Sequence, residues 1–256
     1  IVQIYDAVVE GEYSYIVMEY VDGGTLEKFC TPESLLEPRE VAEIVFKCVR
    51  ALAFAQTLGL THRDLKPGNI LHKEGTEIKI ADFGAAINRV SERTMITNVG
   101  SPAYMAPELV TGSAEASHLS DIYALGVVMY YLLEGMLPFS GANTMSVIYQ
   151  IVNTEPDPPS VHCDSLSPEL DAIVMKALSK DPAKRYQGMQ ELITDLEKHP
   201  LVARGGQVAH LSFRGATEMG GSRPVDENTI YRIYSRTKPV TSVAAMMLFE
   251  DDDAEG

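Results

Sequence analysis

The sequence predicts an α+β fold in which a short β-hairpin precedes a larger, mainly helical region. Two runs rich in β-branched and aromatic residues, 1–9 and 13–20, are joined by Glu10-Gly11-Glu12, a pattern typical of a hairpin. Between Pro38 and Leu58 the apolar residues recur at helical spacing. A later stretch, 120–134, is apolar on almost every side, which indicates a helix buried at the centre of the helical region.

Composition narrows the class of protein. The 256 residues are 45% hydrophobic and 22% charged, which suits one large domain or a domain with a tail. A formal net charge of −15 argues against nucleic acid as the main partner, because phosphate backbones attract basic surfaces. Cys30, Cys48 and Cys163 show no metal-binding spacing and indicate reduced thiols. No run of about 18 apolar residues is present, so we expect a cytoplasmic protein with no membrane segment in this chain.

Helix boundaries can be expected from local signals. Pro38 suits the first turn of a helix, and Gly59 suits its end. Ser120 is expected to cap the apolar helix that runs to about Glu134. Further helices are expected over 143–153, 167–179 and 187–198, with Ser167 as the cap of the second of these.

Two short motifs follow the first long helix and carry the chemistry. They read His62-Arg63-Asp64-Leu65-Lys66-Pro67-Gly68-Asn69-Ile70-Leu71 and, after a short turn, Ile78-Lys79-Ile80-Ala81-Asp82-Phe83-Gly84. Together, in this order, they resemble the catalytic loop and the metal-binding turn of a protein kinase. Either motif alone would be weak evidence for this resemblance, whereas the two motifs in order, separated by one plausible hairpin, are strong evidence for it.

The resemblance implies a role for each polar residue. Asp64 would accept the proton of the attacking hydroxyl, Lys66 would contact the transferred phosphate, and Asn69 with Asp82 would hold Mg²⁺, for which Mn²⁺ could substitute. ATP would be the cofactor. Lys66 inside the loop favours Ser and Thr of proteins as acceptors, because tyrosine kinases place other residues there.

The second N-terminal run would lead into the hinge, near residues 19–24. By resemblance, Met18 would be the gatekeeper beside the adenine, and backbone groups of Glu19 and Val21 would bind its edge. Leu71 would form the floor of the adenine pocket. Without the motifs downstream, the same residues would indicate only a strand ending in a Gly-Gly turn.

A polar segment, 85–101, holds candidate phosphorylation sites. Thr94 and Thr97 are the expected regulatory residues, and a phosphate on either would pair with Arg63. Ser101 is expected to contact Asp64 instead and to help select the acceptor.

Three further residues are expected to support the fold. By resemblance, Arg185 would pair with Glu108, which closes an Ala-Pro-Glu motif, and Asp121 would hold the backbone of the catalytic loop. Tyr123 departs from the family's pattern, which has Trp at that position.

The resemblance covers residues 1–199, and 200–256 is expected to be a flexible or partly ordered tail. No G-x-G-x-x-G occurs in the sequence, and the strand lysine and helix glutamate that hold the ATP phosphates would lie before Ile1. We therefore expect an N-terminally incomplete fragment of a eukaryotic-like (Hanks-type) serine/threonine kinase, similar to bacterial members. It would be two-lobed, with its small lobe truncated to a hairpin, and inactive alone. A pseudokinase or scaffold, and an unrelated α/β binding module, are the alternatives.

Overall fold

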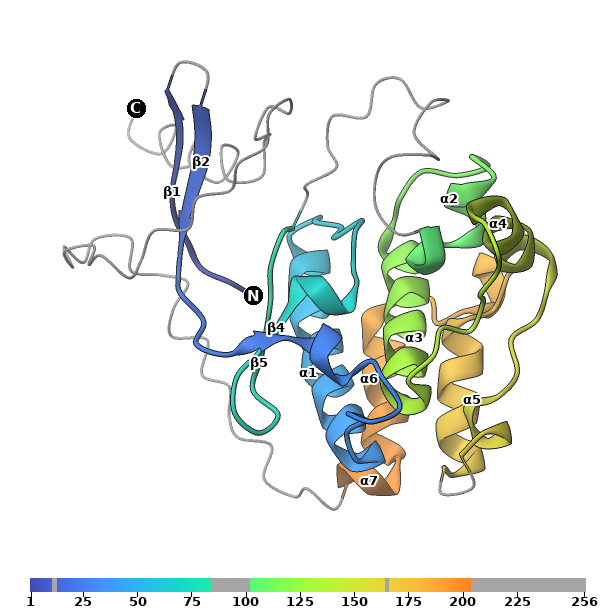
Figure 1. The fold of residues 1–256 in the computed structure, drawn as a ribbon. Coiled ribbons are helices and arrows are strands. Elements are labelled where there is room, and N and C mark those ends of the chain that lie inside the picture. The colour runs from blue at the N-terminus through green and yellow to red at the C-terminus, as the bar shows by residue number, and fades with distance from the viewer. Residues whose placement is uncertain (11–12, 84–101, 164–165, 204–256) are drawn as a thin grey trace.

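The computed structural model describes residues 1–10, 13–83, 102–163 and 166–203 (Figure 1). The N-terminal hairpin consists of β1 (Ile4–Glu10) and β2 (Tyr13–Met18), which pair antiparallel with Ile4 opposite Met18. Figure 1 shows this hairpin standing apart from the helices. Ile4 and Tyr5 are exposed, at 43% and 48% of their surface. The hairpin is the portion of the small lobe that this chain contains.

A second, three-stranded sheet joins the hairpin to the helical lobe. Its order is β3 (Gly24–Thr25), β4 (Ile70–His72) and β5 (Ile78–Ile80), all antiparallel. Gly23 leads into it with φ of 143°, and a Cβ there would lie 2.1 Å from the carbonyl oxygen of His72. Only glycine fits this approach. The sheet therefore connects the predicted hinge directly to the segment that follows the first motif.

Helix α1 (Pro38–Thr57) forms one side of the core, as predicted. Pro38 occupies its first turn, and Glu37 and Glu40 form a capping box at its start. Gly59, with φ of 71°, follows its C-terminal end. Its buried face packs against α3, α6 and β5.

Helix α3 (His118–Glu134) is the buried central helix, but its predicted cap is wrong. Ser117 caps it, and its hydroxyl accepts from the amide of Leu119 at 3.2 Å. Ser120 lies one turn inside, where its hydroxyl accepts from the amide of Ser117 at 3.0 Å. Two serines three residues apart form a reciprocal box, and the first of them is the cap. Gly135, with φ of 68°, ends the helix.

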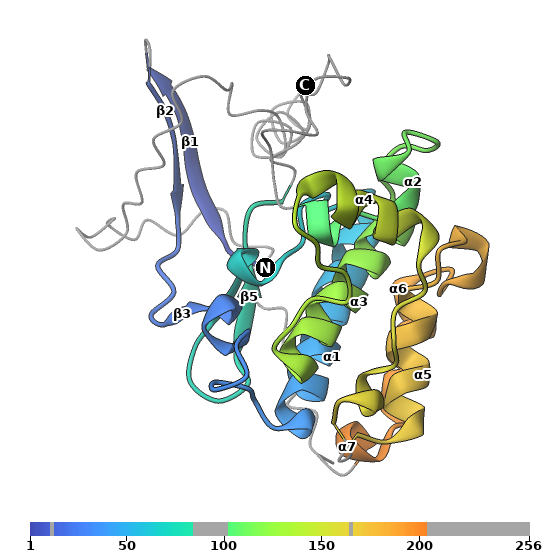
Figure 2. The same ribbon diagram turned by 45° about the vertical axis from the view of Figure 1, so that its right-hand side comes forward.

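The remaining α-helices complete the helical lobe (Figure 2). They are α2 (Pro107–Val110), α4 (Thr144–Asn153), α5 (Pro168–Ala177), α6 (Met189–Lys198) and α7 (Pro200–Ala203). Of these, α5 packs against α3. The predicted cap of α5 is confirmed, since the Ser167 hydroxyl accepts from the amide of Leu170 at 3.3 Å. A Cβ on Gly126 would lie 2.9 Å from that of Ala177, so glycine lets α3 and α5 approach closely. Within the described residues, no helix combines the length and the apolar character that crossing a membrane requires.

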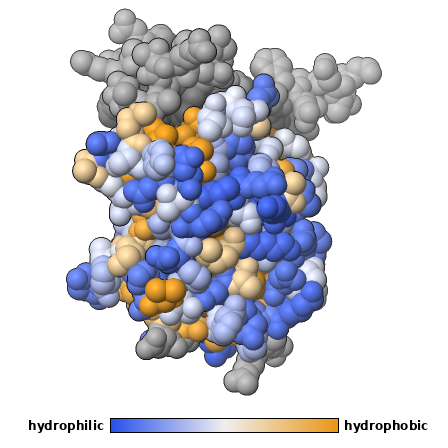
Figure 3. All heavy atoms as spheres, turned by 90° about the vertical axis from the view of Figure 1, so that its right-hand side faces the viewer, coloured by the Kyte–Doolittle hydropathy of each residue, from blue (hydrophilic) through white to orange (hydrophobic). Residues whose placement is uncertain are grey.

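The face that carries α2, α4 and α5 is chemically mixed. Figure 3 shows hydrophobic residues in small groups among hydrophilic ones. Met145 and Tyr149 on α4 are each 65% exposed. Isolated exposed apolar side chains are normal on a protein surface, so this face does not by itself indicate a binding site.

Candidate active site

A buried carboxylate on α3 positions the loop that carries Asp64. Asp121 accepts from the backbone amides of His62 at 2.7 Å and Arg63 at 2.9 Å. Burial raises the pKa of Asp121, while these two amides oppose the shift by favouring the carboxylate. The contact expected from the resemblance is thus present, and it attaches the loop to the most buried helix of the lobe.

His62 connects the loop to the turn that carries Asp82. Its Nε2 lies 2.9 Å from the carbonyl oxygen of Ala81, which can only accept, so Nε2 carries the proton. Its Nδ1 then accepts from the amide of Asp64 at 3.3 Å. Burial lowers the pKa of His62, which favours this neutral form. Phe83 packs against the ring, with centroids 4.7 Å apart.

The polar residues of the loop meet at the carboxylate of Asp64. Lys66 Nζ lies 2.9 Å from Asp64 Oδ2, and both side chains are about one-third exposed or less. Asn69 Nδ2 donates to the Asp64 carbonyl at 2.7 Å and to Oδ2 at 3.2 Å. A carboxylate, a cation and an amide therefore meet at one partly open point, and these are the groups on which phosphoryl transfer to a hydroxyl depends.

Asn69 and Asp82 have the chemistry of a magnesium site. The Asn69 side-chain nitrogen donates to Asp64, so the side-chain oxygen of Asn69 is left to bind a cation. The Asp82 side chain is exposed. Carboxylate and amide oxygens are ligands that Mg²⁺ accepts, and it commonly takes one or two of them from the protein and the rest from phosphates and water. Among the described residues there is no cluster of three His, Cys, Asp or Glu side chains, so a tight all-protein cage is absent there.

Two residues at this site adopt an unusual backbone conformation. Arg63 and Asp82 have φ of 71° and 58°, the only positive values among non-glycine residues in the described part of the chain. Such a conformation is uncommon for side chains other than Asn, Asp and His and tends to mark functional sites. Arg63 belongs to the first of the two sequence motifs and Asp82 to the second.

The hinge residues lie between the two sheets. The Glu19 amide donates to the Gln3 carbonyl at 2.9 Å, and the Glu19 carboxylate forms an ion pair with Lys79. Glu19 therefore has only its carbonyl available for an adenine edge. Met18, at the end of β2, and Val21 are both half-buried. Leu71 lies in β4, half-buried and opposite Thr25 of β3.

The expected pairing of Glu108 with Arg185 is present and buried. The two terminal nitrogens of Arg185 each donate to one oxygen of Glu108 at 2.7 Å. The remaining donors reach the carbonyls of Ser179, Leu119 and Lys180. The Tyr123 ring lies beneath the guanidinium at 5.0 Å, so this substitution for Trp keeps an aromatic face there.

Several expected site residues lie outside the described part of the chain. They are Thr94, Thr97, Ser101 and Gly84.

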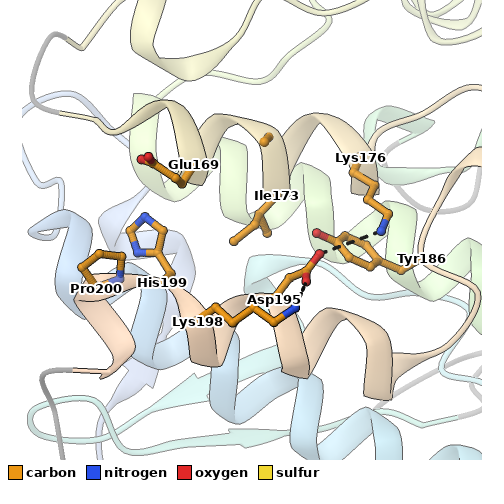
Figure 4. A pocket seen from close by; sticks show the side chains of 9 residues that line it. Glu169, Ile173, Lys176, Tyr186, Asp195, Lys198, His199 and Pro200 are labelled. Carbon is orange, nitrogen blue, oxygen red and sulfur yellow. Dashed lines mark hydrogen bonds and ion pairs between the residues drawn. The ribbon is translucent and has the colours of Figure 1, made fainter.

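A hollow of about 290 Å³ lies elsewhere on the lobe (Figure 4). Lys176, Tyr186, Asp195 and His199 are among its lining residues, which come from α5, α6 and their neighbours. Asp195 pairs there with Lys198 at 3.2 Å and more loosely with Lys176 at 3.9 Å. None of the lining residues belongs to the two motifs, so this hollow is not the candidate active site.

The fold and the site together define a protein kinase. The sequence matches the protein kinase domain family over residues 1–202, which is most of the chain. The chain belongs to that family, and the predicted family and two-lobed fold are confirmed.

Bacterial serine/threonine kinases are among its relatives. The chain is 40% identical over 190 residues to PknB of Mycobacterium leprae, covering 73% of this chain and 30% of the relative. It is 38% identical over 199 residues to PrkC of Bacillus subtilis, covering 77% and 31% respectively. The chain thus spans less than a third of the length of these relatives. A crystal structure of Rad53 1–466 in complex with AMP-PNP matches with a TM-score of 0.65 and 29% identity, over 79% of this chain and 50% of that one.

A second family match was not expected from the sequence. Residues 200–254 match the β-lactamase family, and this match begins where the kinase match ends. The signal that could have revealed it is Ser235-Arg236-Thr237-Lys238, a Ser-x-x-Lys pattern.

Proposed function

We propose that the protein transfers the γ-phosphoryl group of ATP to Ser and Thr hydroxyls of other proteins. The observation that carries this proposal is the convergence of Lys66 and Asn69 on the Asp64 carboxylate, on a loop held by Asp121. The serine/threonine kinases among its relatives support the choice of acceptor. Because the chemistry needs ATP, we place this domain in the cytoplasm.

Each residue of the candidate site has a separate role in this proposed reaction. Asp64 orients the acceptor hydroxyl and takes its proton, while Lys66 stabilises charge on the phosphoryl oxygens. Asn69 and Asp82 would hold Mg²⁺, which when bound neutralises charge on the ATP phosphates. Met18, Val21, Leu71 and the Glu19 carbonyl would surround the adenine.

A comparison of two lengths of the protein tests this function. We expect residues 1–256 to phosphorylate casein far more slowly than the full-length protein, because this sequence contains no glycine-rich loop for the phosphates. The measurement is transfer from γ-labelled ATP, followed by phosphoamino-acid analysis. Phosphotyrosine as the product would contradict the acceptor class. Absence of transfer by the full-length protein would favour the pseudokinase alternative.

We also propose that a phosphate on Thr94 or Thr97 increases activity by pairing with Arg63. Arg63 is exposed beside Asp64, and it forms no ion pair with any described residue. A hydrogen bond to a charged group contributes about 1.5–3 kcal/mol, so losing it should lower activity about tenfold or more.

The variant Thr94→Ala/Thr97→Ala of the full-length protein is expected to show this loss, and Arg63→Ala should show it to a similar degree. Adding Arg63→Ala to the threonine variant should then lower activity little further. The measurement is the initial rate on casein, with mass spectrometry of residues 85–101. Full activity of a protein that is unmodified in this segment would contradict the switch.

A further inference from the structure

A carboxylate outside both motifs reaches the loop that carries Asp64. Glu27 lies in a short 3-10 helix, Leu26–Phe29, which packs against a second short 3-10 helix, Pro67–Asn69, in the first motif. A Cβ on Gly68 would lie 2.8 Å from Glu27 Oε1, closer than Cβ atoms normally approach other groups. The absence of a side chain at Gly68 therefore leaves room for the Glu27 carboxylate, at a point four residues after Asp64.

The same carboxylate lies near a third element, the 3-10 helix Pro102–Tyr104 that precedes α2. Burial is the main cause of the raised pKa of Tyr104 and of Cys30, and the negative charge of Glu27 adds to the shift in both. A charge has this effect only at short range, so the carboxylate must lie near both side chains. Glu27 is thus at the junction of the segment after the hinge, the loop of Asp64 and the segment before α2.

No described residue neutralises this carboxylate. Glu27 is exposed, and it forms no ion pair within the part of the chain that the structure describes. The amine of the adjacent Lys28 lies over the Phe29 ring instead, 4.8 Å from its centroid. An exposed carboxylate without an ion-pair partner, beside the proposed catalytic base, is suited to bind a cation that a substrate brings.

We propose that Glu27 selects acceptor proteins that carry a Lys or Arg within about four residues of the phosphorylated Ser or Thr. This inference rests on the proposed kinase function. Four residues of chain span at most about 13–14 Å, which limits the distance between the backbones of Asp64 and Gly68. An extended acceptor peptide covers the same distance in about four residues. One peptide can therefore place its hydroxyl at Asp64 and its cation at Glu27.

Peptide substrates of the full-length protein test the inference. Each peptide contains one Thr in an otherwise uncharged sequence, and a single Lys is moved through the four positions on either side of it. At one or two of these positions we expect Lys to raise kcat/KM about threefold to tenfold over the uncharged peptide. This range lies between the effect of an exposed ion pair and that of a hydrogen bond to a charged group. Glu27→Gln should remove the preference but phosphorylate the uncharged peptide at the parental rate, which also reports that the variant folds.

Reversal of the charge separates recognition from a structural role. Glu27→Lys should favour peptides that carry Glu at the same position, by a similar factor, which loss of local structure would not produce. The control is Glu74→Gln, which makes the same change at an exposed position in the turn between β4 and β5. It should keep the parental preference within about twofold.

The outcomes distinguish this inference from the function on which it rests. Transfer to the peptides with no preference for Lys or Arg, or a preference that Glu27→Gln retains, would overturn the inference and leave the kinase function intact. Absence of transfer to every peptide and to casein would contradict the kinase function and overturn the inference with it.

Discussion

Replacing Asp64 with Asn in the full-length protein is expected to lower kcat by about 10²–10⁴-fold, the usual contribution of a general base. The change removes the proposed proton acceptor but keeps the shape of the side chain. The Asn69 amide still reaches the Asp64 backbone carbonyl, a contact of 2.7 Å that the substitution does not touch. An amide oxygen at position 64 can still accept from Lys66. Turnover should therefore fall while the fold and ATP affinity change little.

Asp157→Asn is the matched control for this experiment. It makes the same change of charge and volume at an exposed position that lies outside both motifs. We expect its kcat to stay within about twofold of the parent, as is usual for surface substitutions away from special features. The measurement is the initial rate of casein phosphorylation at saturating ATP. A kcat for Asp64→Asn close to that of the control would rule out Asp64 as the base.

The second large effect is on stability. Arg185→Ala is expected to lower the free energy of unfolding of the helical lobe by about 3–5 kcal/mol, because it leaves a buried charge without its partner. The Arg185 side chain is 0% exposed and that of Glu108 is 8% exposed, so water cannot replace the lost contacts. Carbonyls that now accept from the guanidinium would also lose a donor.

Lys198→Ala is the control, because it removes an ion pair of the same type from the surface. Lys198 is 70% exposed and lies 3.2 Å from Asp195, and exposed pairs contribute about 0–1 kcal/mol. The measurement is hydrogen exchange of peptides from α3 in the full-length protein across a urea series. A second test replaces both partners with Leu, which should recover much of the loss, since a packed apolar pair can substitute for a buried ion pair. Equal urea midpoints for Arg185→Ala and Lys198→Ala would contradict the argument.

Local chemistry in the sequence was enough to predict the main elements of the fold. Helix α1 begins at Pro38 and is followed by Gly59, as the capping signals indicated. The cap of α3 was misplaced because Ser117 and Ser120 are both suitable residues, and only the hydrogen bonds distinguish them. The exact end of a helix depends on which of two similar neighbouring residues caps it. The existence of an apolar helix does not depend on that difference.

The residues of the candidate site could be predicted from the sequence, but the contacts between them could not. Asp64, Lys66, Asn69 and Asp82 follow from the two motifs. The ion pair of Glu19 with Lys79 joins residues sixty positions apart, and no local pattern specifies it. The positive φ of Arg63 also arises from tertiary contacts, because its amide is directed at Asp121. The β-lactamase match over residues 200–254 was not predicted, because the glycine pairs and acidic end of that stretch have the composition of a tail.

The imidazole of His62 has a consequence for motion within the site. A flat ring of fixed dimensions separates the Ala81 carbonyl from the Asp64 amide, and it is hydrogen-bonded to both. A displacement of the strand end before Asp82 must either break one of these bonds or carry the Asp64 backbone with it. The His62 ring thus keeps the separation of these two backbone segments fixed, and we expect Asp64 and Asp82 to shift together when either segment moves.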